Sequence, residues 1–205
     1  GNGGAASSNP GGLTVVGNTL YFRADDGTNG YELWKSDGTA SGTVMVKNIN
    51  PAVGATGTSY PEHLTAIGNT FYFSADDGTN GGELWKSDGT ASGTVMVKDI
   101  WYASSSSGIL YLTVVGNTLY FRAHDGTHGA ELWKSDGTAS GTVMVKDIIS
   151  GSGGGTVSWL TALGNTLYFS ASDGTHGYEL WKSDGTASGT VMVQDIRTGP
   201  TNTGS

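Results

Sequence analysis

Several kinds of residue are missing or scarce in this chain, and each absence excludes a class of structure. The 205 residues include no cysteine, which excludes disulfide frameworks, thiolate metal sites and cysteine nucleophiles. No apolar run approaches the roughly 18 residues of a membrane-spanning helix, so we expect no membrane insertion. Proline occurs only four times, whereas glycine occurs 35 times. Together with regularly placed Trp, Leu, Val and Tyr, this composition is typical of a turn-rich all-β protein and not of a disordered one.

Positive charge is also sparse. Ten Lys and Arg residues stand against 18 Asp and Glu residues, which gives a formal net charge of −8. The ten basic residues are spread along the chain and form no cluster that could follow a phosphate backbone. We therefore expect neither nucleic acid nor an anionic membrane as a partner.

An internal repeat is the strongest signal in the sequence. The motif ELWKSDGT occurs four times and places Trp34, Trp85, Trp133 and Trp181 in register, 51, 48 and 48 residues apart. The residues around the motif also agree closely from copy to copy. A period of this size indicates a supersecondary unit that buries its faces only against neighbouring copies.

Each copy is predicted to form four strands. In the first copy, apolar alternation and turn residues place them at 13–16, 19–24, 31–35 and 43–49. No segment outside the linkers shows the 3.6-residue apolar period of a helix over a useful length. Because these strands are apolar on both faces, each four-stranded sheet needs a neighbour on either side, and radial stacking in a β-propeller satisfies this need. We expect one all-β propeller domain with blades at 13–49, 64–100, 112–148 and 160–196, between Gly-rich tails at 1–12 and 197–205.

Two features of this architecture stay open at the level of sequence. The four copies can close a four-bladed ring, or they can supply half of an eight-bladed ring that a second chain completes. The segment 13–16 can also pair within its own copy or act as the outer strand of the last blade.

The motif carries a resemblance to a known family. The copies resemble the bacterial ELWxxDGTxxGT repeat, a propeller-blade sequence of large secreted and surface proteins, over residues 13–196. Similarity to WD-repeat blades is more distant: Trp34 and the Asp26-Gly27-Thr28 segment occupy comparable places, but the signature His and Trp-Asp pair are absent. The resemblance implies a propeller and extracellular or cell-surface display, and it brings no catalytic residues with it.

The copies differ most in their linkers, which contain aromatic residues that the strand pattern does not explain. Aromatic side chains in Gly- and Ser-rich loops offer a large contact area at little entropic cost. They are therefore candidates for contacts with a partner, with coverage of the nearest blade edge as the structural alternative. These candidates are Tyr60, Trp101, Tyr102, Tyr111 and Trp159.

Two sets of repeated residues invite both a structural and a functional interpretation. Trp34, Trp85, Trp133 and Trp181 are predicted to lie in the core between blades, but exposed Trp faces would instead bind sugar rings. Asp26, Asp77, Asp125 and Asp173 each open a D-G-T-x-G loop. These carboxylates are expected to cap their own turns, with a calcium site as the alternative. No other cofactor is indicated.

These observations favour a binding or structural module over an enzyme. A catalytic site would appear as one irregular group of polar residues, whereas nearly every polar residue here recurs in all four copies with an evident role in a turn or edge. We expect a non-catalytic extracellular propeller that binds a protein partner or further copies of itself. The alternatives are a multivalent carbohydrate-binding propeller and a consensus-like or artificial repeat scaffold.

Overall fold

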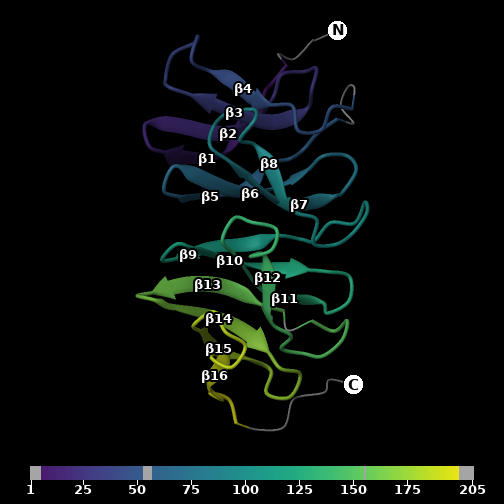
Figure 1. Ribbon diagram of the computed structural model, residues 1–205, viewed down its shortest axis with the longest axis vertical. Coiled ribbons are helices and arrows are strands. Elements are labelled where there is room, and N and C mark those ends of the chain that lie inside the picture. Colours follow the sequence, from purple (N-terminus) through teal and green to yellow (C-terminus); the bar gives the residue numbers. More distant parts are fainter. Residues whose placement is uncertain (1–5, 53–56, 155, 199–205) are drawn as a thin grey trace. The chain divides into compact units, whose positions relative to one another are not determined.

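A computed structural model describes residues 6–52, 57–154 and 156–198, and its regular secondary structure consists of β-strands (Figure 1). Within these ranges no helix has the length and apolarity needed to cross a membrane. The chain forms two compact units, Gly1–Ser106 and Ser107–Ser205. The predicted tails, 1–12 and 197–205, lie partly outside the described residues.

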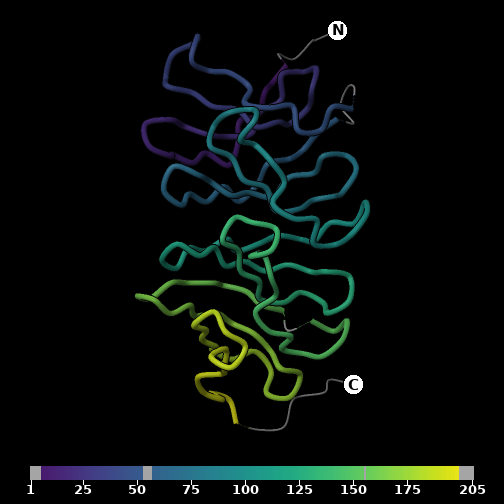
Figure 2. Tube along the Cα trace, viewed as in Figure 1, coloured from purple at the N-terminus to yellow at the C-terminus, as the bar shows by residue number. Residues whose placement is uncertain are grey.

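Each unit contains two four-stranded antiparallel sheets, and each copy of the repeat forms one sheet. The strands follow one another in sequence order across every sheet, so the chain runs back and forth through one sheet before it enters the next (Figure 2). In the first unit, sheet 1 contains β1 (Gly11–Val16), β2 (Thr19–Asp25), β3 (Tyr31–Ser36) and β4 (Val44–Lys47), and sheet 2 contains β5 (Glu62–Ile67), β6 (Thr70–Asp76), β7 (Gly82–Ser87) and β8 (Val95–Lys98). In the second unit, sheet 3 contains β9 (Leu110–Val115), β10 (Thr118–His124), β11 (Ala130–Ser135) and β12 (Val143–Lys146), and sheet 4 contains β13 (Ser158–Leu163), β14 (Thr166–Ser172), β15 (Tyr178–Ser183) and β16 (Val191–Gln194).

This topology confirms the predicted all-β fold of four four-stranded antiparallel sheets that resemble propeller blades. It also decides between the two pairings of the first strand, because β1 pairs with β2 of its own copy. The two are joined by a two-residue turn in which Gly17 has a φ of +59°, a conformation that suits glycine.

The sheets begin and end two residues earlier than the predicted blades. In sheet 1, β1 starts at Gly11, and β4 stops at Lys47. The strand ends there because the amide of Ile49 donates to the buried carboxylate of Glu32, at 2.8 Å, and so is turned away from strand pairing. The amides of Ile100, Ile148 and Ile196 make the same bond in the other copies.

Each sheet has two apolar faces. Within a unit, one face of the first sheet packs against one face of the second sheet. We call the leucine face of sheet 1 the side formed by Val16, Tyr21, Leu33, Val46 and Ile49. We call the tryptophan face of sheet 2 the side formed by Leu64, Phe71, Phe73, Ala75 and Trp85. These two faces form the core of the first unit, and the equivalent faces of sheets 3 and 4 form the core of the second. The first strands β1 and β5 also contact each other, as do β9 and β13.

The prediction that all four motif tryptophans lie in the core is wrong for Trp34. Trp85, Trp133 and Trp181 are buried, each with 6% of its surface exposed, but Trp34 is partly exposed. Within the first unit, sheet 2 covers the leucine face of sheet 1 and leaves the opposite face, which carries Trp34, without a neighbouring sheet. Position in the stack, and not the motif itself, therefore sets the burial of this residue.

Candidate functional site

The first strand of each sheet contains a β-bulge, and the bulged residue has a left-handed backbone conformation. In the first copy this residue is Gly12, with a φ of +65°. In the other copies it is His63, Tyr111 or Trp159, with φ values of +60°, +58° and +57°. Large side chains adopt this conformation rarely, at a cost of about 1–3 kcal/mol. Since glycine is accepted in the first copy, the large side chains are not needed to form the bulge.

Two of these bulged residues form an aromatic pair in the second unit, and one of the two rings is exposed. The rings of Tyr111 and Trp159 lie 6.2 Å apart, centroid to centroid, at an angle of 43°. Trp159 has 75% of its surface exposed, and Tyr111 is partly buried. Bulges commonly direct a side chain outward at functional sites. Among the predicted interaction residues, these two thus lie together, and the ring of Trp159 faces solvent.

A second aromatic group lies in the first unit. Tyr60 is exposed and stacks on Tyr31, with ring centroids 5.1 Å apart. The guanidinium carbon of Arg23 lies 5.9 Å from the centroid of the Tyr31 ring, and Arg23 forms an ion pair with Glu62. Tyr60 is therefore held in place by neighbours while half of its surface faces solvent.

The other two linker aromatics have different environments. Tyr102 is exposed over most of its surface. Trp101 is partly buried, and its amide donates to the carboxylate of Glu83 at a distance of 3.4 Å. The backbone of Trp101 is thus tied to its own sheet, whereas Tyr102 is exposed to solvent.

The four loop aspartates cap their own turns. In the first copy, one oxygen of Asp26 accepts hydrogen bonds from the amides of Thr28 and Asn29, both at 2.8 Å, and the other accepts from the Asn29 side chain. These bonds lower the pKa of Asp26. Asp77, Asp125 and Asp173 accept equivalent backbone bonds in their own loops.

In the last two copies a histidine takes the place of the asparagine. The Nδ1 atoms of His128 and His176 lie 2.7 Å from Asp125 and Asp173. The hydrogen bond to the carboxylate raises the pKa of each imidazole. Burial opposes the charge of Asp173, but the hydrogen bonds from the amide and ring of His176 outweigh it and lower the pKa of Asp173 to about 2.

The calcium alternative finds no ligand set in the described part of the chain. No group of three or more His, Asp or Glu side chains there could hold a metal ion. The oxygens of Asp26, Asp77, Asp125 and Asp173 instead face N–H donors of their own loops, and a cation would have to displace these donors.

A buried glutamate joins each sheet to the linker that follows it. Glu32 is fully buried and accepts bonds from the amide of Ile49, at 2.8 Å, and from the amide and hydroxyl of Ser59, at 3.2 and 2.7 Å. Burial raises the pKa of Glu32 despite these bonds. The carbonyl of Ser59 accepts in turn from the amide of Asp76 in sheet 2. Ser59 thereby connects two neighbouring sheets.

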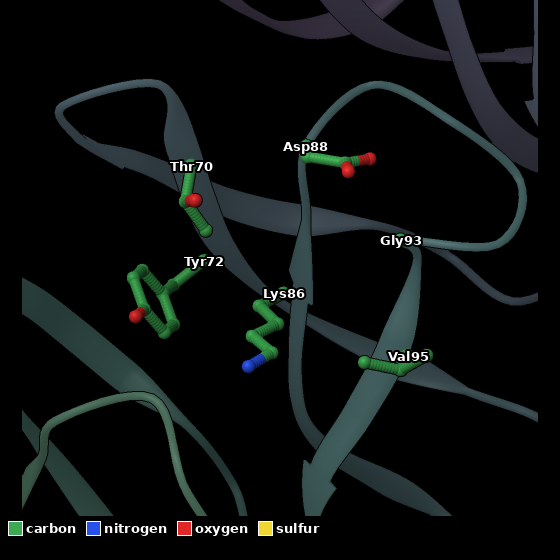
Figure 3. A pocket seen from close by; sticks show the side chains of 6 residues that line it. All are labelled: Thr70, Tyr72, Lys86, Asp88, Gly93 and Val95. Atoms are coloured by element: carbon green, nitrogen blue, oxygen red, sulfur yellow. The ribbon is translucent and has the colours of Figure 1, made fainter.

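One pocket recurs at the same repeat positions in sheets 2 and 4. In sheet 2 it encloses about 270 Å³, and Figure 3 shows Lys86 extending from its strand toward the side on which Tyr72 lies. The acid in the pocket, Asp88, accepts bonds from the amide and hydroxyl of Thr90 in its own turn. Thr70, Lys86, Asp88, Gly93 and Val95 line the pocket in sheet 2, and Thr166, Lys182, Asp184, Gly189 and Val191 line it in sheet 4. The pocket thus recurs with the repeat, and in sheet 2 its acid is engaged by its own turn.

Sequence reasoning missed the bulge and the role of Ser59. The sequence does hold one indication of the bulge. When the four copies are aligned, the bulged position is glycine in the first copy, Gly12, and a large residue in the others, His63, Tyr111 and Trp159. Such a position indicates a backbone with positive φ. No comparable sign exists for Ser59, because it lies in a linker that differs in length and sequence from the others.

Comparison with known proteins gives a fold without a family. No protein-family model matches the chain, and no curated protein matches it. Among solved structures it is similar to puromycin hydrolase, with a TM-score of 0.63 and 15% identity over 96% of this chain and 30% of the other. It is also similar to a puromycin-hydrolyzing peptidase of Mycobacterium tuberculosis (TM-score 0.57, 12% identity, 96% and 31% covered) and to a prolyl endopeptidase (0.52, 16%, 88% and 26%). The chain thus spans under a third of these proteins, and the likeness shows a β-propeller-like fold.

Proposed function

We propose that this chain is a non-catalytic extracellular or cell-surface propeller module that binds protein surfaces, including further copies of itself. The observation that carries the proposal is the set of large rings at bulged positions. Tyr111 and Trp159 occupy a strained conformation that glycine fills in the first copy, and Trp159 is exposed. A residue that is strained and exposed contributes little to folding, and it is better explained by a contact outside the fold.

The repeat motif supports the same proposal. The sequence ELWKSDGTASGT matches the ELWxxDGTxxGT repeat of bacterial secreted and surface propellers in all four copies. We propose membership of this family, which implies extracellular display. The capping roles of the loop aspartates also support a non-catalytic module, since these carboxylates are engaged by their own turns.

The proposal is tested by measuring whether soluble full-length chain binds to immobilised full-length chain. Trp159→Gly should weaken binding about tenfold or more, as expected for a central aromatic contact. Trp159→Tyr, which keeps an aromatic ring, should retain most of it. Thermal unfolding should show that Trp159→Gly is at least as stable as the wild type, because glycine relieves the strain. Absence of binding by the wild type, or equal binding by the Gly variant, contradicts the proposal.

A carbohydrate ligand is the second candidate. The buried positions of Trp85, Trp133 and Trp181 leave these rings inaccessible to a sugar, so the exposed Tyr111–Trp159 pair is the surface that favours this candidate. A glycan array probed with the wild type and with Trp159→Gly distinguishes the two functions. Hits that disappear in the variant would favour carbohydrate binding.

A further inference from the structure

The leucine face of sheet 4 is exposed, although the same face is buried in the other sheet of its unit and in sheet 1. Leu180, Val193 and Ile196 have 41%, 44% and 72% of their surfaces exposed. Their counterparts in sheet 1, Leu33, Val46 and Ile49, have 0%, 7% and 4% exposed. Such a contiguous set of exposed apolar side chains marks an interaction surface.

The tryptophan face of sheet 1 is exposed, although the same face of sheet 2 is buried. Leu13 has 61% of its surface exposed, whereas its counterpart Leu64 in sheet 2 has 9%. Trp34 is partly exposed, whereas Trp85 is buried. The first unit thus has an open tryptophan face on sheet 1, and the second unit has an open leucine face on sheet 4. Within both units, a leucine face is covered by a tryptophan face.

Polar groups at the two open faces match in the same way. Where a leucine face is covered, a lysine on it donates to a hairpin carbonyl of the next sheet: Lys35 to Gly89 at 2.9 Å, and Lys134 to Gly185 at 2.8 Å. Lys182, at the same position in sheet 4, has no hydrogen-bond partner within the described ranges.

The hairpin glycine of sheet 1 that corresponds to the lysine acceptor Gly89 also has no side chain packed on it. A Cβ built on Gly89 would lie 2.1 Å from the hydroxyl of Tyr21, so Tyr21 packs directly on that glycine. A Cβ on Gly38, the same hairpin position in sheet 1, would have no atom within 4 Å. Tyr168, the counterpart of Tyr21, is only partly buried in sheet 4.

A serine links the two sheets of the first unit, and the equivalent links at sheet 1 and sheet 4 each lack one partner. Ser59 bonds both Glu32 of sheet 1 and the amide of Asp76 in sheet 2. Ser8 occupies the equivalent place before sheet 1, since its carbonyl accepts from the amide of Asp25 at 2.9 Å, but no described glutamate lies on its other side. Glu179 of sheet 4 accepts from the amide of Ile196, and no serine among the described residues bonds it.

We propose that the leucine face of sheet 4 docks on the tryptophan face of sheet 1 of a second copy of this chain. In this contact Lys182 donates to the carbonyl of Gly38, and Glu179 accepts from Ser8. The inference rests on the proposed function and adds to it a second self-association surface, separate from the Tyr111–Trp159 pair. A second copy is the occupant because it carries the tryptophan face and hairpin glycine that cover a leucine face in both units, and the serine that joins the two sheets of the first unit. A contact between two different faces is heterologous, so each copy can offer one face to one neighbour and the other face to the same or another neighbour.

One residue departs from this template. Lys47 and Lys146 donate to the carbonyls of Thr94 and Thr190, and each ammonium group lies 5.8 Å from the ring centre of Trp85 or Trp181. In sheet 4 this position is Gln194. An amide can still donate a hydrogen bond, but it lacks the charge for the cation–π contact. Gln194→Lys should therefore tighten the pairing about two- to fivefold.

The experiment is light scattering coupled to size-exclusion chromatography of the full chain. The wild type should have at least twice the single-chain mass of 21.0 kDa, and Val193→Arg should elute as a single chain. Val191→Arg is the matched control on the same strand. Val191 has 37% of its surface exposed, close to the 40% of Val44 and 37% of Val143, so coverage of a leucine face leaves this position outside. This control should keep the wild-type mass.

Complementation makes the test independent of misfolding. Leu13→Arg blocks the other open face at an exposed position, so it should also give single chains. An equimolar mixture of Val193→Arg and Leu13→Arg should restore pairs, because each pair then contains one unaltered interface. Unfolded variants could not do this.

Three results would overturn the inference. These are a wild-type mass of 21.0 kDa at every concentration, an unchanged mass for Val193→Arg, and a mixture that fails to pair although both variants show the wild-type circular dichroism. The proposed function fails separately. If Val193→Arg leaves the mass unchanged while Trp159→Gly abolishes binding, the inference falls and the proposed function stands. If pairs form and Trp159→Gly binds the immobilised protein as well as the wild type does, the inference stands and the aromatic surface has no role in self-binding.

Discussion

The ammonium group of Lys35 in β3 donates a hydrogen bond to the carbonyl oxygen of Gly89, 2.9 Å away in the hairpin that follows β7. This bond joins sheet 1 to sheet 2 at the edge of their shared core. Replacing the lysine with methionine keeps the length of the side chain and removes the donor. We expect Lys35→Met to lower the free energy of unfolding by about 1 kcal/mol, because the bond is charged but only partly buried. Urea unfolding followed by circular dichroism measures this change.

The same substitution at the fourth copy is the control for Lys35→Met. In the Val193→Arg background, which we expect to keep the chain single, Lys182 has no described acceptor, so Lys182→Met should change stability by less than about 0.5 kcal/mol. Equal losses for the two substitutions would show that the methylene stem, and not the hydrogen bond, stabilises the fold.

Glu32 offers a second comparison between copies. Its carboxylate accepts from three backbone amides and one hydroxyl that hold the following linker, whereas Glu179 accepts from the amide of Ile196. Glutamine would turn an N–H group toward one of these donors and leave it unsatisfied. We expect Glu32→Gln to cost about 1–3 kcal/mol and Glu179→Gln to cost less. Hydrogen exchange of the Ile49 amide, which donates to Glu32 at 2.8 Å, should accelerate in the Glu32 variant and not in the Glu179 variant, and unchanged exchange in the Glu32 variant would rule out this account.

Much of the fold could be predicted from the sequence because residues typical of turns recur at the same positions in every copy. Gly17 and the Ser-Asp-Gly-Thr hairpins bound the strands, and the alternation in ELWK predicts which residues face a neighbouring sheet. The exposure of Trp34 could not be predicted, since its motif is identical to that of Trp85 and only the presence of a covering sheet differs. Burial that depends on position in a stack is not encoded in a repeated motif.

The candidate site was predicted less well, for local physical reasons. Tyr111 and Trp159 were predicted as aromatic residues in variable linkers. Their backbone strain comes from a bulge in the first strand, and in their own copies no glycine marks the bulged position. For Asp26 the sequence showed a carboxylate in a glycine loop, which fits both a cation site and a turn cap. The amides of Thr28 and Asn29 decide in favour of the cap, and backbone donors of this kind are present in every sequence.

The two histidine loops predict a dependence of stability on pH. The pKa values of His128 and His176 are raised in the folded protein, so their stabilisation is complete below the ordinary value of 6.5 and is lost as the pH rises through the folded pKa. The pKa of Asp173 is lowered to about 2, so its contribution is complete above 3.8 and is lost only as the pH falls toward 2. The loops should therefore be most stable between these limits.

The double variant His128→Asn/His176→Asn tests this dependence. Asparagine occupies the position in the first two copies and donates to the loop carboxylate through its side chain at 2.8 Å, so the loop should keep its form. Between about pH 6 and 8 the melting temperature should fall for the wild type and stay flatter for the variant. Parallel profiles would show that the histidines do not contribute through their charge.

Gly141, in the hairpin that follows β11, provides the last prediction. A Cβ built there would lie 2.1 Å from a carboxylate oxygen of Asp136, which accepts from the amide and hydroxyl of Thr138 at 2.9 and 2.7 Å. Gly141→Ala must displace this carboxylate and break both bonds, so we expect a loss of about 1–3 kcal/mol. Gly153→Ala is the control, because its Cβ would meet only Ile149 at an ordinary 3.6 Å. That substitution should be neutral or slightly stabilising, since alanine restricts the unfolded chain. Thermal unfolding of both variants measures the difference, and a Gly141→Ala variant as stable as Gly153→Ala would mean that the hairpin can form without the Asp136–Thr138 bonds.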